Sequence, residues 1–234
     1  MVPPLVLDID GTLTTPDHRI DPRVFELLPG WEAPVVFATG KAFPYPVALA
    51  HFLGLPQLVV AETGGIAYDG ESTTITGDPA ACEAVVERFR ELGGEIGWGA
   101  GETVNRWRET EIAVSMDADE RLLREAAAEA DGDVEIVDTG YAYHVKSTGV
   151  NKGNGLTVIA DSLGVQPRSF VAVGDSENDV STFEQAGEAY AVANADDAAK
   201  AAADHVLEEG FMNGTAKLLA SLRDDRSPSA SSTA

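Results

Sequence analysis

Two kinds of hydrophobic pattern alternate along this sequence. In the first 77 residues, short continuous apolar runs are separated by stretches with helical periodicity, and the same style returns after residue 150. Continuous apolar strands are typical of a parallel sheet that helices cover on both faces. We expect strands at 2–7, 33–38, 58–61, 65–68, 169–173 and 189–193, and helices at 22–28, 42–53, 151–163, 196–203 and 213–222, with one more beginning at 178.

The middle third has a different pattern. Residues 79–92 and 119–130 show helical periodicity, whereas 103–107, 111–116, 134–137 and 142–145 alternate apolar and polar side chains. Such alternation is typical of strands with one exposed face, and the order of elements indicates an open-faced α+β unit with a partly antiparallel sheet. We therefore expect an α/β core at 1–77 and 150–223, an inserted α+β cap at 78–149, and a disordered tail at 224–234 that has no apolar residues to bury.

The charge balance limits the classes of partner that this protein is expected to bind. Thirty-nine acidic side chains stand against 16 basic ones, for a net charge of −23. Nucleic acid and anionic membranes are therefore poor partners, since both require a positive surface. The negative charges of such a protein also repel one another. Because the Debye length falls to about 3 Å at 1 M salt, concentrated salt screens this repulsion, and we expect a salt-loving protein.

The single cysteine, Cys82, excludes an internal disulfide and favours a reducing compartment. No apolar run reaches the roughly 18 residues that a membrane-spanning helix needs. We expect a cytoplasmic protein that is a monomer or a homodimer.

The first candidate site follows the first apolar run, in the sequence Asp8-Ile9-Asp10-Gly11-Thr12. Open parallel sheets bind ligands at the carboxyl ends of their strands, which is where this pair of carboxylates lies. Residues two apart in an extended chain point the same way, so both carboxylates can face one ligand. An acidic turn after an edge strand is the alternative.

Two further strands end in polar residues. Thr39 and Gly40 follow 33–38 and offer a hydroxyl and backbone N–H groups that suit a phosphate oxygen. Asp175, Asn178 and Asp179 follow 169–173, and two acidic clusters with oxygen ligands could share one Mg²⁺. The alternative for Asn178 or Asp179 is that it only caps the next helix.

Lys152 stands one residue after Asn151, a predicted helix N-cap. A cation in the first turn of a helix opposes the helix dipole. We interpret Lys152 as reaching into the anionic site, where it neutralises carboxylate and phosphate charge.

Together these motifs resemble the haloacid dehalogenase superfamily of phosphatases with a C2-type cap, and the resemblance covers about 1–77 and 150–222. Two segments, 62–65 and 208–215, look most like archaeal-type phosphoglycolate phosphatases, although Thr63 stands where those relatives usually carry Asn. The motifs that carry the resemblance are Asp8-x-Asp10-Gly11-Thr12, Thr39, Lys152 and Gly174-Asp175-Ser176-x-Asn178-Asp179.

The resemblance implies a role for each residue. Asp8 would be the nucleophile that forms an aspartyl phosphate, and Asp10 would be the general acid and then the general base. Mg²⁺ would bind Asp8, Asp175 and the backbone carbonyl of Asp10, with Asp179 nearby. The residues implied to bind the phosphoryl group are Thr39, Gly40, Lys152 and Asn178.

The implied substrate is a small phosphorylated metabolite, in the first place 2-phosphoglycolate. Arg106, Arg108, His144 and Lys146 are candidate contacts for a substrate carboxylate, with exposed charges on a strand as the alternative for each. A sugar-phosphate phosphatase, a phosphomutase and a phospho-accepting signalling domain remain as alternative functions.

Overall fold

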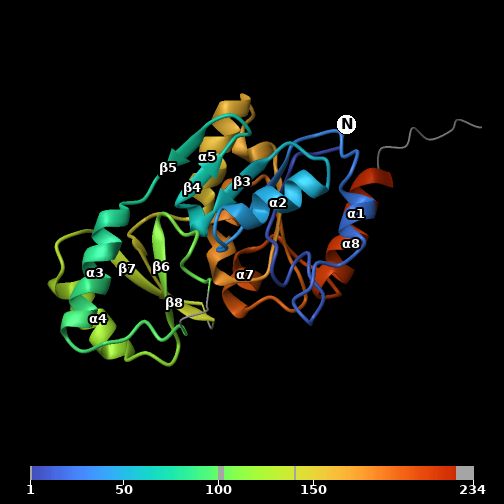
Figure 1. The fold of residues 1–234 in the computed structure, drawn as a ribbon. Helices are drawn as coiled ribbons and strands as arrows, with labels where there is room; N and C mark the ends of the chain where they lie inside the picture. The colour runs from blue at the N-terminus through green and yellow to red at the C-terminus, as the bar shows by residue number, and fades with distance from the viewer. Residues whose placement is uncertain (1, 100–102, 140, 225–234) are drawn as a thin grey trace, which may run out of the picture.

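A computed structural model describes residues 2–99, 103–139 and 141–224. Its strands form two separate sheets, one of eight strands and one of three (Figure 1). The predicted disordered tail begins at Asp224, the last residue of helix α8, and its residues 225–234 lie outside the described residues.

The larger sheet has the strand order β11-β10-β9-β1-β2-β3-β4-β5. All its pairs are parallel except β3–β4 and β4–β5. The chain leaves β1 towards β2 on one side and later returns to β9 on the other, which places a topological switch point at β1. The strands are β1 (Leu5–Leu7), β2 (Val35–Ala38), β3 (Leu58–Ala61), β4 (Ile66–Tyr68), β5 (Thr73–Ile75), β9 (Val171–Gly174), β10 (Glu188–Ala191) and β11 (His205–Val206).

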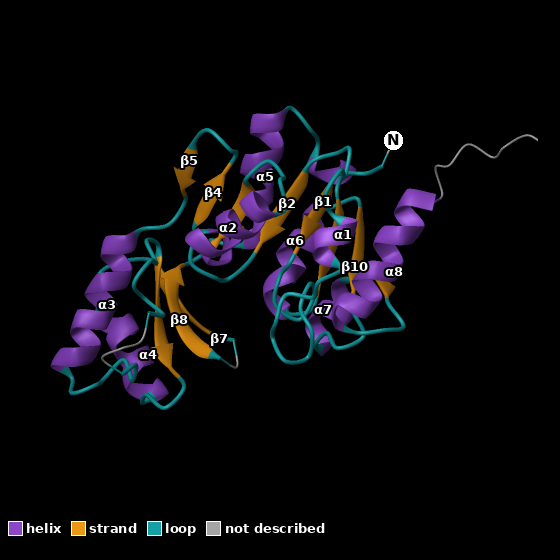
Figure 2. Ribbon diagram, turned by 45° about the vertical axis from the view of Figure 1, so that its right-hand side comes forward, coloured by secondary structure: helices purple, strands orange, loops and turns teal. Residues whose placement is uncertain are grey.

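Helices flank this sheet, as the predicted α/β class requires (Figure 2). Helix α2 begins at Pro44, since proline at the first helical position loses no hydrogen bond. Asn151 caps α5, because its side chain accepts a hydrogen bond from the backbone N–H of Asn154. The elements are α1 (Val24–Leu27), α2 (Pro44–Phe52), α5 (Lys152–Leu163), α6 (Val180–Gln185), α7 (Asp197–Ala202) and α8 (Phe211–Asp224), with 3₁₀ turns η1 (Glu62–Gly64), η2 (Pro167–Ser169) and η3 (Glu177–Asp179).

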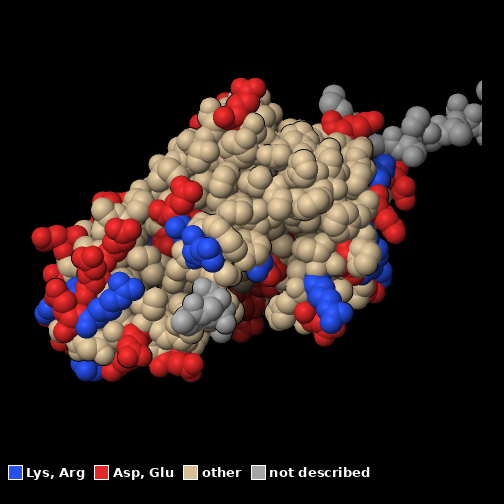
Figure 3. Space-filling model, viewed as in Figure 1, with Lys and Arg blue, Asp and Glu red and all other residues tan. Residues whose placement is uncertain are grey.

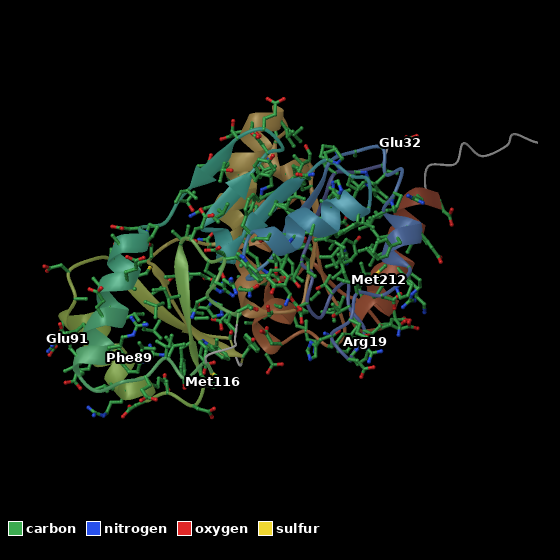
Figure 4. The ribbon with its side chains drawn as sticks, viewed as in Figure 1. Arg19, Glu32, Phe89, Glu91, Met116 and Met212 are labelled. Carbon is green, nitrogen blue, oxygen red and sulfur yellow. The ribbon has the colours of Figure 1, made fainter. Side chains whose placement is uncertain are left out.

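Residues 78–149 are called the smaller unit below. Their described part, 78–99, 103–139 and 141–149, contains an antiparallel sheet in the order β6-β8-β7 and two helices. The helices pack on one face of this sheet around Phe89, which is fully buried, whereas Met212 belongs to the core of the larger sheet (Figure 4). The elements are α3 (Pro79–Glu91), β6 (Glu111–Ser115), α4 (Glu120–Glu129), β7 (Val134–Asp138) and β8 (Ala142–Ser147).

The strand predicted at 103–107 is wrong, because residues 104–107 form turns. The side-chain amide of Asn105 explains why. Its Nδ2 donates to the carbonyl of Ala113 at 2.8 Å, and its Oδ1 accepts from the N–H of Ala113 at 2.8 Å. One side chain thereby satisfies backbone groups of β6 that a neighbouring strand would otherwise pair with. Strands β5 and β11 were not predicted, since both are exposed and carry no apolar pattern.

Acidic side chains outnumber basic ones on the face of the molecule shown in Figure 3, in keeping with the net charge of −23. Among the described residues, no helix has both the length and the apolar character that crossing a bilayer requires.

Candidate active site

Three adjacent strands bring the predicted residues to one edge of the larger sheet. Asp8 follows β1, Thr39 follows β2, and Asp175 follows β9. Because β1 lies between β2 and β9 and pairs in parallel with both, their carboxyl ends meet. The three residues line a cavity of about 750 Å³, together with Asp10, Gly40 and Asn178.

Lys152 and Asp179 lie beneath this cavity. Lys152 is 0% exposed, and its Nζ donates to Oδ1 of Asp8 at 2.8 Å and to Oδ1 of Asp179 at 2.7 Å. Burial alone would lower the pKa of Lys152, but the charges of the two carboxylates outweigh it and raise the pKa. The ammonium group is therefore a permanent positive charge inside the site.

Asp8 is only 6% exposed. Burial raises the pKa of Asp8 well above its usual range, and the charges of Asp179 and Asp175 add to this effect while Lys152 opposes it. Its Oδ2 is buried and has no hydrogen-bond partner among the residues that the structure describes. A buried carboxylate oxygen without a donor is costly unless another positive group faces it.

A divalent cation fits these observations. Asp8, Asp175 and Asp179 each offer a carboxylate oxygen, and these oxygens lie within 4.8 Å of one another. Oxygen ligands of this kind are those that Mg²⁺ prefers, and its charge would satisfy Oδ2 of Asp8. The residues that would hold the ion are therefore among those that the sequence analysis named.

Asp179 also binds the backbone of the loop that carries Asp175. Its Oδ2 accepts hydrogen bonds from the backbone N–H groups of Asp175 at 3.0 Å and Ser176 at 3.1 Å. It thus takes part in the cap of η3, as the alternative interpretation proposed, and also pairs with Lys152. Both of its oxygens are engaged, so Asp179 fixes the loop that carries Asp175.

Burial, and after it the charge of Asp179, raises the pKa of Asp175 to about 7. The backbone of Gly11 also passes close to the side chain of Asp175. Gly11 has a φ of +77°, and a Cβ built there would lie 1.9 Å from Oδ2 of Asp175. Only glycine can stand at this position while Asp175 keeps its place.

Asp8 and Asp10 lie in contrasting environments. The side chain of Asp10 is 41% exposed, and its Oδ1 lies 3.2 Å from Nζ of Lys41. Two carboxyl groups in such different surroundings can perform different roles in one reaction. Lys41 was missed by the sequence analysis, although it directly follows the Thr39-Gly40 motif; whether the Asp10 carbonyl binds metal stays a prediction.

The hydroxyl of Thr39 is buried and accepts a hydrogen bond from the backbone N–H of Lys41 at 3.1 Å. Its own hydrogen therefore remains available for a ligand oxygen. Asn178 also lines the cavity, and its Oδ1 accepts a hydrogen bond from the hydroxyl of Ser176 at 3.2 Å.

The four candidate carboxylate contacts in the smaller unit fall into two groups. Arg108 and His144 line the cavity, and both side chains are largely buried. Arg106 is exposed, and Lys146 is buried against Glu135 at 2.6 Å. The alternative, that these residues are exposed charges on a strand, is therefore wrong for Arg108, His144 and Lys146. Arg106 is exposed, but it lies in a turn and not in a strand.

Glu62 ties the two units together, and its role was not foreseen. It follows β3, is buried, and accepts from the N–H groups of Glu109 at 3.0 Å and Thr110 at 2.8 Å and from the Thr110 hydroxyl at 2.8 Å. Burial raises the pKa of Glu62, against the effect of these hydrogen bonds. The sequence signal that could have identified Glu62 is its position as a polar residue at the end of a predicted parallel strand.

Comparison with known proteins places this geometry in a family. A model of haloacid dehalogenase-like hydrolases matches residues 101–219. A protein from Halorubrum lacusprofundi named phosphoglycolate phosphatase is 69% identical over 223 residues, which cover 95% of this chain and 98% of the relative. A protein of the same name from Methanococcoides burtonii is 37% identical over 212 residues, covering 90% and 92%.

Solved structures agree on the fold. A crystal structure of a Thermoplasma acidophilum protein has a TM-score of 0.80 at 23% identity, covering 95% of this chain and 99% of that one. The fold, the motifs at the strand ends and these relatives lead to one conclusion: the chain belongs to the haloacid dehalogenase-like hydrolases.

Proposed function

We propose that this chain is a Mg²⁺-dependent phosphatase that converts 2-phosphoglycolate and water to glycolate and phosphate through an aspartyl phosphate on Asp8. The observation that carries the proposal is the state of the Asp8 carboxylate. Lys152 holds one of its oxygens, while the other is buried without a partner among the described residues, beside Asp175. The names of the two archaeal relatives support the choice of substrate.

In the first half of the reaction, an oxygen of Asp8 attacks phosphorus and the bond from phosphorus to the ester oxygen breaks. Asp10, which lines the cavity and is partly exposed, gives its proton to the departing alkoxide. Lys152 and the hydroxyl of Thr39 neutralise and hold the phosphoryl oxygens, with Asn178 at the cavity wall. When bound by Asp8, Asp175 and the Asp10 carbonyl, with Asp179 nearby, Mg²⁺ supplies the positive charge that lets a carboxylate approach a phosphate dianion.

In the second half, Asp10 takes a proton from a water molecule, which attacks the phosphorus of the aspartyl phosphate. Phosphate leaves and the Asp8 carboxylate is restored. One carboxyl group can serve as acid and then as base because the reaction is split into two displacements.

The smaller unit, residues 78–149, would act as a cap that covers the reacting groups. This proposal is supported by its contribution of Thr103, Val104, Arg108, Thr139 and His144 to the lining of the cavity. A cap of this kind excludes water while the aspartyl phosphate exists.

Phosphate release from 2-phosphoglycolate, sugar phosphates and an aryl phosphate, measured with Mg²⁺ or with EDTA, tests the proposal. Parallel assays at low and high KCl test the proposed salt requirement, which rests on the net charge of −23. Mg²⁺-dependent release with a clear preference for 2-phosphoglycolate is the expected result. Preference for sugar phosphates would overturn the substrate, and no release from any ester would overturn the chemistry.

A further inference from the structure

The sheet of the smaller unit has a polar face opposite its helices. Along β6 and β8, Val114 and Val145 belong to the apolar cluster beneath the helices. Because successive strand residues point to opposite faces, Glu111 and His144 lie on the other face. Both are buried there, and His144 lines the cavity.

Glu111 contacts two basic side chains on this face. Its Oε1 is paired with Nη1 of Arg108 and lies 2.9 Å from Nδ1 of His144. Burial would raise the pKa of Glu111, but the neighbouring charges of His144, Arg108 and Lys146 outweigh it and hold the pKa below its usual range. Glu111 is therefore an anion that fixes the positions of the guanidinium and the imidazole.

Arg108 is also anchored to the larger unit. Its Nη1 donates to the carbonyl of Gly40 at 3.0 Å, and its Nε donates to the carbonyl of Val104 at 3.2 Å. Within 2–99, 103–139 and 141–224, its Nη2 donates no hydrogen bond. Since Gly40 adjoins Thr39, the guanidinium lies beside the loop proposed to hold the phosphate.

A substrate with a second anionic group besides its phosphate needs a positive side chain such as this guanidinium in the cavity. The walls carry the carboxylates of Asp8, Asp10 and Asp175, which repel any other negative charge. The ammonium of Lys41 is paired with Asp10, and Lys152 lies between Asp8 and Asp179 at the end of the site proposed for the phosphate. Arg108 is also paired, with Glu111, but only through Nη1, which leaves Nη2 for a ligand. A planar guanidinium held in one orientation is the group best suited to bind a carboxylate.

We infer that Arg108, positioned by Glu111 and adjoined by His144, binds the carboxylate of the substrate and thereby selects phosphate esters that carry a carboxylate close to the phosphate. This inference rests on the proposed function and names the part of the cavity that would give it specificity. Arg108 is then a specificity-determining residue that contacts substrate, and Glu111 is a positioning residue.

The test compares two substrates in each protein, 2-phosphoglycolate and an aryl phosphate without a carboxylate. We expect Arg108→Met to lower the ratio of their kcat/KM values by about 100-fold, chiefly through the KM for 2-phosphoglycolate. Arg108→Lys keeps a positive charge but loses the planar guanidinium that Glu111 and Gly40 hold in one orientation, and should lower the ratio by about tenfold. Arg106→Met, an exposed arginine two residues away, is the matched control and should leave the ratio unchanged.

The ratio is independent of the fraction of each sample that is folded, so a destabilised variant still gives an answer. An Arg108→Met ratio equal to that of the wild type would overturn the inference, as would a wild type without preference for carboxylated esters. A wild type that prefers 3-phosphoglycerate to 2-phosphoglycolate, with the ratio still dependent on Arg108, would overturn the proposed substrate and support the inference.

Discussion

Replacing Lys152 by Met should destabilise the protein as well as inactivate it. The ammonium is 0% exposed and lies 2.8 Å from Asp8 and 2.7 Å from Asp179, so its removal leaves two buried carboxylates without countercharge. Removing one partner of a buried ion pair costs about 3–5 kcal/mol. We expect a loss of this size in the free energy of unfolding at pH 7.5, and a fall in kcat of at least about 100-fold.

The sign of the pH dependence follows from the carboxylates. Without Lys152 the pKa of Asp8 rises further, because the ammonium is the group that lowers it. A raised folded-state pKa gives stability that is present at acid pH and lost as the pH rises through that pKa. The difference between wild type and Lys152→Met should therefore shrink as the pH is lowered from 7.5 to 5.

Urea denaturation followed by circular dichroism, in EDTA and constant KCl, measures the effect. The double variant Lys152→Met/Asp179→Asn should recover part of the loss, since one buried charge is removed. Lys217→Met is the control, because this lysine is 68% exposed in its ion pair with Glu209, and an ion pair screened by solvent should contribute little to stability. A Lys152→Met protein no less stable than Lys217→Met would refute the reasoning.

Two other carboxyl groups give measurable consequences. Asp175→Asn should stabilise the metal-free protein at pH 8 by up to about 4 kcal/mol, because each pKa unit corresponds to about 1.4 kcal/mol and the pKa of Asp175 rises from 3.8 to about 7. Denaturation in EDTA should show this gain vanish towards pH 4, and a gain that does not depend on pH would contradict it. Glu62→Ala leaves the N–H group of Glu109 and the buried N–H group of Thr110 without their partner and should cost about 2–4 kcal/mol. Hydrogen exchange at these two amides should become faster in Glu62→Ala, and unchanged exchange would show that Glu62 does not hold the units together.

The sequence predicted which residues meet at the edge of the larger sheet, because chain order and strand position determine this. Asp8, Thr39 and Asp175 each follow an apolar run, and adjacent parallel strands bring such positions together whatever their separation along the chain. Lys152 could be interpreted in the same way, because a cation in the first turn of a helix is locally unfavourable and indicates a partner elsewhere.

The interior of the smaller unit could not be predicted in the same way. Asn105 replaces a strand through two hydrogen bonds of its side chain to Ala113, and alternation of polar and apolar residues does not reveal such a contact. Glu111 looks like an ordinary exposed residue of a half-buried strand, but it is buried and paired with Arg108 and His144. Such contacts are set by how the segments pack in three dimensions, which local patterns do not contain.

The most direct test of the central claim is to trap the covalent intermediate. Enzyme mixed with ³²P-labelled 2-phosphoglycolate and Mg²⁺ is quenched in acid during turnover, digested, and mapped by mass spectrometry. The account predicts a phosphorylated peptide containing Asp8, and neither label nor turnover in Asp8→Asn. Label on another residue, or turnover retained in Asp8→Asn, would contradict it.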